Sequence, residues 1–115
     1  LIHDGKIIGT TLKHHLPNYG VFDEQRYFTR GPLPHPISFM GVKLGVMICE
    51  DMWFPDVAEH LAQHGADMLI VTNASPYEAQ KHNIRLQHAQ LRVEKTGLPL
   101  IFVNQWGGQD DLVFD

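Results

Sequence analysis

Short apolar runs alternate with longer amphipathic stretches through the second half of the chain. Runs rich in Val, Ile and Leu occupy residues 43–48, 66–72 and 98–104. Short, nearly continuous apolar runs of this kind are typical of strands buried on both faces. Stretches with helical spacing of apolar residues separate them, at 55–64 and 77–96. The order strand, helix, strand, helix, strand predicts an α/β fold.

Both predicted helices carry boundary signals. Pro55 suits a first helical turn, and Asp56 and Glu59 favour its N-terminal dipole. Gly65 and Gly97 are expected to end the two helices, because glycine readily adopts the left-handed conformation of a helix stop. The apolar side of the second helix is predicted to carry Ile84, Leu86, His88, Ala89, Leu91, Val93 and Lys95.

The first third of the chain is less regular. Residues 6–12 have strand composition and follow a turn at Asp4 and Gly5. Residues 13–36 are interrupted by prolines and glycines and are expected to form a long irregular segment, which in a compact domain is usually functional. Residues 37–40 are predicted to form an edge strand.

Composition narrows the classes of function. The chain has 115 residues, of which 43% are hydrophobic. Its net charge is −4 and the sequence has no basic stripe, so neither nucleic acid nor a membrane is expected as a partner.

A single cysteine excludes an internal disulfide and favours the reducing cytoplasm. The chain begins at Leu1 and ends in an apolar segment from Val113, after a glycine-rich turn at 105–110. We therefore expect residues 1–115 to be part of one domain of a longer protein.

Cys49 directly follows the apolar run 43–48 and precedes two carboxylates, Glu50 and Asp51. A lone thiol where a strand gives way to a turn is a candidate nucleophile. The alternative is a small buried residue without reactivity, the usual role of a structural cysteine. For Asp51 we favour a structural role at the entry to the following helix.

Lys13 follows a predicted strand and is the first residue of the irregular segment. Beside a thiol it would lower the thiol pKa and stabilise a developing oxyanion; otherwise it is a solvated surface lysine. Glu24 could hold such a lysine in place, or pair with Arg26 at the surface. Cys49 and Asn73 also follow predicted strands, where ligand sites of α/β folds gather.

Eight histidines raise the question of a metal site. His14 and His15 are adjacent and would point to opposite sides of an extended segment. His82 and His88 are six residues apart, which fits one helical face poorly, and neither HExxH nor CxxC is present. The sequence therefore leads us to expect no metal site.

Four ordered blocks carry a resemblance to the nitrilase, or carbon–nitrogen hydrolase, superfamily. They are similar in particular to the glutaminase domain of bacterial-type glutamine-dependent NAD synthetases, over nearly the whole chain. The blocks are KHHLPNYGVFDEQRYF at 13–28, ICEDMW at 48–53, NASPY at 73–77 and VNQWGGQD at 103–110. The resemblance implies an α-β-β-α sandwich, of which this chain would hold an incomplete part.

The resemblance also implies a reaction. Family members hydrolyse an amide or nitrile through a Glu-Lys-Cys triad and a covalent acyl-enzyme. Carried onto this sequence, the nucleophile is Cys49 and the lysine that stabilises the oxyanion is Lys13. The backbone N–H of Glu50 would complete the oxyanion hole, and Glu24 matches a supporting glutamate.

The substrate implied is L-glutamine. Tyr19, Trp53, Ser75 and Lys81 match substrate-side positions of this branch. At Lys81 some relatives carry arginine, so the charge is kept here but the bidentate geometry is lost.

Two expected parts lie outside this chain. The general-base glutamate of the family precedes the lysine, in a segment absent here, so the fragment alone is expected to be inactive. The C-terminal synthetase domain, with its ATP, Mg²⁺ and deamido-NAD, is also absent; no cofactor and no metal are expected in the fragment itself. A homo-oligomer is expected for the parent. The alternatives are a stand-alone nitrilase-family amidase or carbamoylase, and a non-catalytic module with the same fold.

Overall fold

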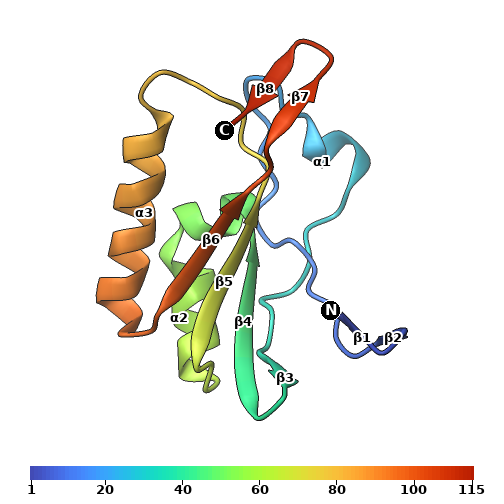
Figure 1. The fold of residues 1–115 in the computed structure, drawn as a ribbon, viewed down its shortest axis with the longest axis vertical. Coiled ribbons are helices and arrows are strands. Elements are labelled where there is room, and N and C mark those ends of the chain that lie inside the picture. The colour runs from blue at the N-terminus through green and yellow to red at the C-terminus, as the bar shows by residue number, and fades with distance from the viewer.

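The computed structural model describes residues 1–115 and is built on a four-stranded sheet in the order β3-β4-β5-β6 (Figure 1). The outer strand β3 (Ile37–Phe39) is antiparallel to β4 (Val42–Ile48). Strands β4, β5 (Met68–Asn73) and β6 (Leu100–Asn104) are parallel, which confirms the predicted α/β fold. Parallel neighbours require a crossover, and helices supply it here.

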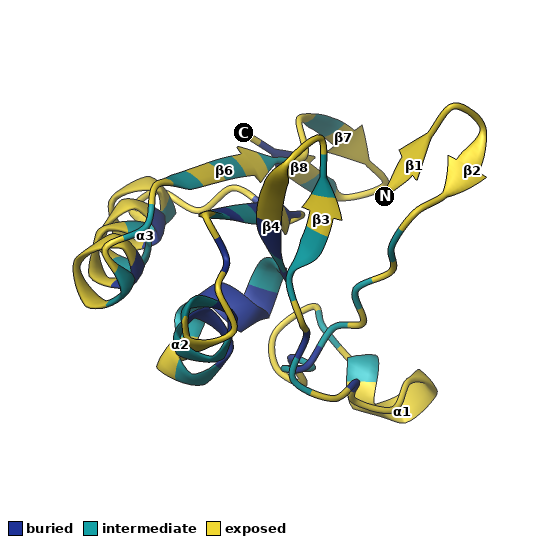
Figure 2. Cartoon of the chain, turned by 90° about the horizontal axis from the view of Figure 1, so that it is seen from below, coloured by how far each residue is buried: buried dark blue, intermediate teal, exposed yellow.

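Two helices, α2 (Pro55–Gln63) and α3 (Lys81–Thr96), make these crossovers and lie on the same face of the sheet (Figure 2). A 3₁₀ turn at Cys49–Trp53 joins β4 to α2. As predicted, Gly97 ends α3 with φ +70°. Neither helix is long and apolar enough to cross a membrane, nor is any other helix of the chain.

The hydrophobic core lies between the sheet and α2. Leu69 and Val71 of β5 point into it and pack with Val57 and Leu61 of α2, all fully buried. Gly45 lies beside Leu69 in the sheet, and a Cβ there would come within 3.3 Å of the Leu61 Cβ. The absence of a side chain at Gly45 therefore lets α2 approach β4 closely.

The opposite face of the sheet is also apolar, but no element of the chain covers it (Figure 2). Val46, Ile70 and Ile101 form one row across β4, β5 and β6, and Val103 lies in the next. Ile101 and Val103 are 48% and 55% exposed. The structure thus holds one helical layer and one sheet, half of an α-β-β-α arrangement.

Smaller elements surround the sheet. They are the hairpin of β1 (Ile2–His3) and β2 (Lys6–Ile7), the short helix α1 (Glu24–Tyr27), and the hairpin of β7 (Gly107–Gln109) and β8 (Leu112–Phe114). The predicted turn at Asp4 and Gly5 is present, with both residues at positive φ. The prediction of a strand over 6–12 was wrong beyond Ile7, because residues 8–12 find no strand to pair with.

The prediction that the second helix begins at 77 was also wrong. The N–H of Tyr77 donates to the carbonyl of Val113 at 2.7 Å, and Pro76 forms an isolated bridge with Phe114. These bonds to β8 hold the segment extended and delay α3 until Lys81.

The predicted apolar side of α3 faces the core only in part, through Ala89, which packs against the core, and His88, whose ring lies on Trp53. Ile84, Leu86 and Leu91 are 39%, 50% and 43% exposed. The side of α3 that is buried carries Arg85 and Arg92 instead. Helical spacing therefore placed only His88 and Ala89 correctly, and most of the predicted apolar side is exposed.

We expect the 115-residue chain, produced alone, to unfold without a sharp transition and to bind the dye ANS. The open sheet face leaves apolar area in water that burial would otherwise stabilise at about 25 cal/mol per Å². Thermal unfolding followed by near-UV circular dichroism, with ANS fluorescence alongside, measures both properties. A cooperative melt at high temperature with no ANS binding would contradict this prediction.

Candidate active site

Cys49 is placed by an unusual backbone conformation. Strand β4 ends at Ile48, and Cys49 adopts a φ of +50° as it opens the 3₁₀ turn. Left-handed conformations are unfavourable for residues with a Cβ and cost about 1–3 kcal/mol. The sharp change of direction ends the strand at the carboxyl edge of the sheet, where ligand sites of α/β proteins gather.

A buried carboxylate stabilises this turn. Asp51 is fully buried, and its Oδ2 accepts the N–H of Ile48 at 3.0 Å. Its Oδ1 accepts the N–H groups of His14 and His15 at 3.0 and 2.8 Å. The same side chain thus bonds the Cys49 turn and the segment that carries Lys13, in agreement with the structural role expected for Asp51.

Lys13 and Glu24 form an ion pair at the side of the site. The Lys13 Nζ lies 2.6 Å from the Glu24 Oε1, and the two side chains are only 15% and 23% exposed. The surface alternative for Glu24 does not occur, because Arg26 pairs with Asp23. The carbonyl of Lys13 accepts the N–H of Gly31 at 2.8 Å, which fixes the backbone as well.

A cavity of about 610 Å³ brings Cys49, Lys13 and Glu24 together. Its wall combines these three side chains with apolar residues and with the end of β5. The further lining residues are Leu12, Leu16, Phe22, Phe28, Thr29, Ile48, Thr72, Asn73 and Ala74. The cavity therefore offers a thiol and a fixed ammonium group to one small ligand.

The electrostatic surroundings keep the resting thiol protonated. Burial raises the pKa of Cys49 above its ordinary value, and the carboxylates of Glu50 and Glu24 act in the same direction. Hydrogen bonding to the Ala74 backbone and the charge of Lys13 oppose this rise. A reaction at this thiol consequently needs a base to remove its proton.

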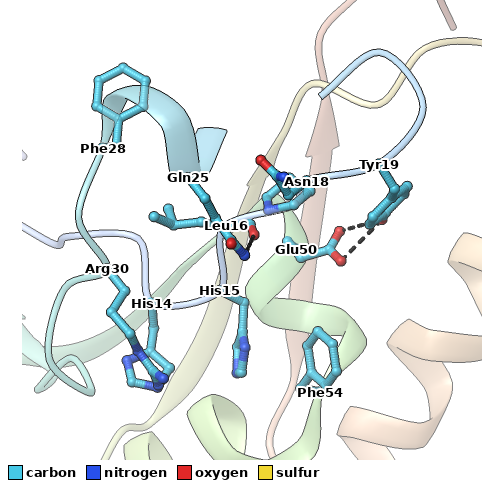
Figure 3. A pocket seen from close by; sticks show the side chains of 11 residues that line it. His14, His15, Leu16, Asn18, Tyr19, Gln25, Phe28, Arg30, Glu50 and Phe54 are labelled. Carbon is cyan, nitrogen blue, oxygen red and sulfur yellow. Dashed lines mark hydrogen bonds between the residues drawn. The ribbon is translucent and has the colours of Figure 1, made fainter. Parts of the chain in front are cut away.

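A second pocket, of about 560 Å³, adjoins the cavity at Leu16 and Phe28, which line both (Figure 3). In it the Tyr19 hydroxyl donates to the Glu50 carboxylate, at 2.8 Å from Oε2. Burial and this carboxylate raise the pKa of Tyr19, so its hydroxyl stays a donor at neutral pH. Tyr19 and Glu50 thereby join the loop before α1 to the turn after Cys49.

The loop after β5 adjoins the cavity of Cys49, which Asn73 and Ala74 line. The Asn104 Oδ1 accepts the N–H of Ser75 at 3.1 Å and the side-chain amide of Asn73 at 2.6 Å. The Arg85 Nη2 donates to the carbonyls of Ser75 and Pro76 at 2.8 and 3.1 Å. These bonds set the path of the backbone beside Ala74.

Not every residue assigned to the site from the sequence lines the cavity of Cys49. Trp53 packs its ring on His88, with 4.3 Å between ring centroids. Lys81 pairs with Glu78 at 2.6 Å. The Ser75 hydroxyl is buried and has no hydrogen-bond partner within the chain. Tyr19 lines only the adjoining pocket.

Sequence reasoning missed the supports of the loop after β5. Asn104 lies in a block that was recognised, but its contact with Ser75 crosses 29 residues and leaves no local pattern. Arg85 was overlooked because the helical analysis followed apolar spacing only. An arginine between apolar positions of a helix that covers a sheet could have indicated such a support. A buried arginine requires hydrogen-bond partners, which a nearby loop can supply.

These features define the class of the protein. The chain belongs to the carbon–nitrogen hydrolase family, because the sequence model of that family matches residues 1–114. A glutamine-dependent NAD(+) synthetase of Rhodobacter capsulatus is 50% identical over 115 residues, which are 100% of this chain and 21% of that protein. The chain thus spans about a fifth of the length of this curated relative.

Solved structures show the same relationship. A glutamine-dependent NAD+ synthetase from Acinetobacter baumannii, in complex with ADP, matches 99% of this chain and 22% of its own, with a TM-score of 0.91 and 45% identity. A mutant amidase from Nesterenkonia sp. AN1 matches 90% of this chain and 39% of its own, with a TM-score of 0.71 and 30% identity; acrylamide has added to its active site cysteine. The predicted nitrilase-like fold, incomplete in this chain, is confirmed.

Replacing Asp51 by asparagine should destabilise the turn. One carboxylate oxygen becomes an NH₂ group that faces a backbone N–H, and an unsatisfied buried donor costs about 1–3 kcal/mol. We expect a lower urea midpoint for the full-length protein and slower alkylation of Cys49. Asp111→Asn, at an exposed position, is the matched control. Equal stability and labelling in the two variants would contradict the role of Asp51.

The labelling of Cys49 by iodoacetamide should rise with pH through a midpoint above that of an ordinary cysteine, because burial raises the thiol pKa. Removing a positive charge destabilises the thiolate, so Lys13→Ala should move the midpoint to still higher pH. Lys6→Ala, at an exposed position, serves as control. Quantitative mass spectrometry of the alkylated peptide gives the rates. An unchanged midpoint in Lys13→Ala would show that the charge of Lys13 does not influence the pKa of Cys49.

Proposed function

We propose that the chain is part of the glutaminase domain of a glutamine-dependent NAD synthetase. The observation that carries this proposal is the single cavity that joins Cys49 to the ion pair of Lys13 and Glu24. The similarity to NAD synthetases over the full chain, at up to 50% identity, supports the choice of substrate. In this proposal the site releases ammonia from L-glutamine for the amidation of deamido-NAD.

The chemistry follows from the three side chains. The deprotonated Cys49 sulfur attacks the side-chain amide carbon of glutamine, and the C–N bond breaks to give a thioester and ammonia. The Lys13 ammonium and the N–H of Glu50 stabilise the oxyanion of the tetrahedral intermediate, the kind of interaction worth a large part of a rate enhancement. Water then hydrolyses the thioester to glutamate and restores the thiol.

Each supporting residue has a separate task. Glu24 holds the Lys13 ammonium at 2.6 Å, which fixes its direction before substrate arrives. Because the thiol is protonated at rest, a general base must accept its proton and pass it to the leaving ammonia. We assign this step to a glutamate upstream of Lys13, outside the chain.

The four remaining site residues are proposed as glutamine contacts. Tyr19 bonds Glu50 in the pocket that adjoins the cavity of Cys49. The Ser75 hydroxyl has no hydrogen-bond partner within the chain but is buried, so a contact with glutamine requires the loop after β5 to shift. Lys81 and Trp53 turn toward Glu78 and His88 in this structure. A contact of either with glutamine therefore requires a change of side-chain rotamer.

The proposal places further parts of the enzyme outside residues 1–115. A synthetase domain would bind ATP with Mg²⁺ and deamido-NAD, and the ADP bound to the Acinetobacter baumannii relative supports this part. Homo-oligomerisation would cover the apolar stripe of α3, where Leu86 is 50% exposed. The single free cysteine supports a cytoplasmic location.

A second candidate is a stand-alone amidase that acts on another small amide. The similarity to the Nesterenkonia amidase favours it, since that protein also reacts at a cysteine. It would use the same thiol and lysine but would form no NAD. The third possibility, a module with the fold but no activity, predicts an unreactive Cys49.

Cys49→Ala in the full-length protein should abolish NAD formation from deamido-NAD, ATP and glutamine. The same variant should keep NAD formation when ammonia replaces glutamine, because the synthetase step does not need the thiol. NAD is measured with each nitrogen donor in turn. Activity with ammonia shows that the Cys49→Ala variant is folded, and so serves as the control for the assay with glutamine.

The other outcomes identify the rival functions. Cys49-dependent release of ammonia from another amide, with no NAD formed, would establish the amidase. Unchanged glutamine-dependent synthesis in Cys49→Ala would exclude Cys49 as the nucleophile. No reaction of Cys49 with a glutamine-like chloroketone would favour the non-catalytic module.

A further inference from the structure

Three histidines meet away from the active site, between α2 and the segment that precedes β3. His60 lies in the last turn of α2, His64 directly follows that helix, and His35 comes from the loop after Gly31. One ring nitrogen of each lies within 4.8 Å of the other two. The ring centroids are 4.0 Å apart for His60 and His64 and 4.7 Å apart for His35 and His64.

The hydrogen bonds leave ligand atoms free. The His64 Nδ1 lies 2.8 Å from the carbonyl of His60, to which it donates, so Nε2 carries the free lone pair. Metal-binding histidines typically donate their second nitrogen in this way, which orients the ring. The His60 Nε2 is buried and has no partner, an uncompensated polar atom that calls for an explanation.

The arrangement is held from both sides. His60 and His64 are four residues apart, the spacing that places two side chains on one helical face. His35 stands between Pro34, which is buried, and Pro36, so its backbone has little freedom.

We propose that His35, His60 and His64 form a binding site for a divalent transition-metal ion, for which Zn²⁺ is the best match. Three imidazole ligands and one open position suit zinc, with Zn–N distances of about 2.0–2.1 Å. His35 and His64 are exposed and can close onto the ion by adjusting their rotamers, while His60 is held by the helix.

A second histidine cluster does not qualify. His14, His15 and Asp56 also lie within 4.8 Å of one another. However, the His15 Nε2 already bonds the Asp56 carboxylate at 2.8 Å, and the His14 ring bonds both the carbonyl of Gly31 and the Arg30 guanidinium. The His15 Nε2 and both ring nitrogens of His14 are therefore used, whereas the Nε2 atoms of His60 and His64 are available.

A bound ion would join α2 to the loop that contains His35. That loop continues from Gly31, whose N–H donates to the carbonyl of Lys13. A Cβ at Gly31 would come within 2.5 Å of the Leu12 Cβ, so the two segments are in close contact. The ion would therefore fix the backbone support of Lys13 without touching the cavity of Cys49.

The test is a Zn²⁺ titration of the full-length protein against a chelator of known affinity. Cys49→Ala is used as the background, since it removes the one thiolate of this chain from competition. His64→Ala and His35→Ala should each weaken the site at least about tenfold, the lower bound for losing even an outer partner of a metal. His82→Ala, an exposed histidine on α3, should leave the affinity unchanged.

Co²⁺ in place of Zn²⁺ provides a second measurement, because its visible absorption reports the coordination number. We expect a four- or five-coordinate spectrum that disappears in His64→Ala and His35→Ala. Both substitutions are at exposed positions, and circular dichroism verifies that the variants fold. Equal Zn²⁺ affinity in the background protein and in both histidine variants, or a purely octahedral Co²⁺ spectrum, would overturn the proposal.

Discussion

The buried Asp51 carboxylate is the interaction on which the geometry of the site depends. It accepts three backbone N–H groups, one from the end of β4 and two, 36 and 37 residues earlier, from the segment that carries Lys13. A carboxylate buried without such bonds would be expensive, so the two segments and the side chain stabilise one another. Cys49 and Lys13 come to the same cavity because this one group bonds the backbone next to each of them.

The sheet could be predicted from the sequence because its strands are marked locally. β4, β5 and β6 are apolar on both faces, and Pro55, Gly65 and Gly97 mark the ends of the helices between them. The predictions failed where backbone pairing with a distant strand decides the local conformation. Ile8 to Leu12 have strand composition but no partner, and Tyr77 is helical in composition but bonded to Val113. Propensity cannot detect a partner that lies 36 residues away.

The candidate site was predictable in part. A single thiol after a strand, a lysine and a glutamate suggested a cluster, and the structure places the three on one cavity. The supporting bonds of Asn104 and Arg85 were not predictable, because they join residues far apart in the sequence. The juxtaposition of three histidines was not predictable for a different reason: the spacing of His60 and His64 is regular, but their third neighbour, His35, lies in a loop without any pattern of its own.

The positive φ of Cys49 sets stability against function at a single position. Glycine is the residue that best tolerates this backbone conformation, and it would relieve the strain that a Cβ imposes. Glycine, however, carries no thiol. Under the proposed function, a cysteine at this position keeps the domain below the stability that its fold permits, a local example of the general trade-off between activity and stability. Compensation for this strain has to come from the hydrogen bonds of neighbouring residues rather than from position 49 itself.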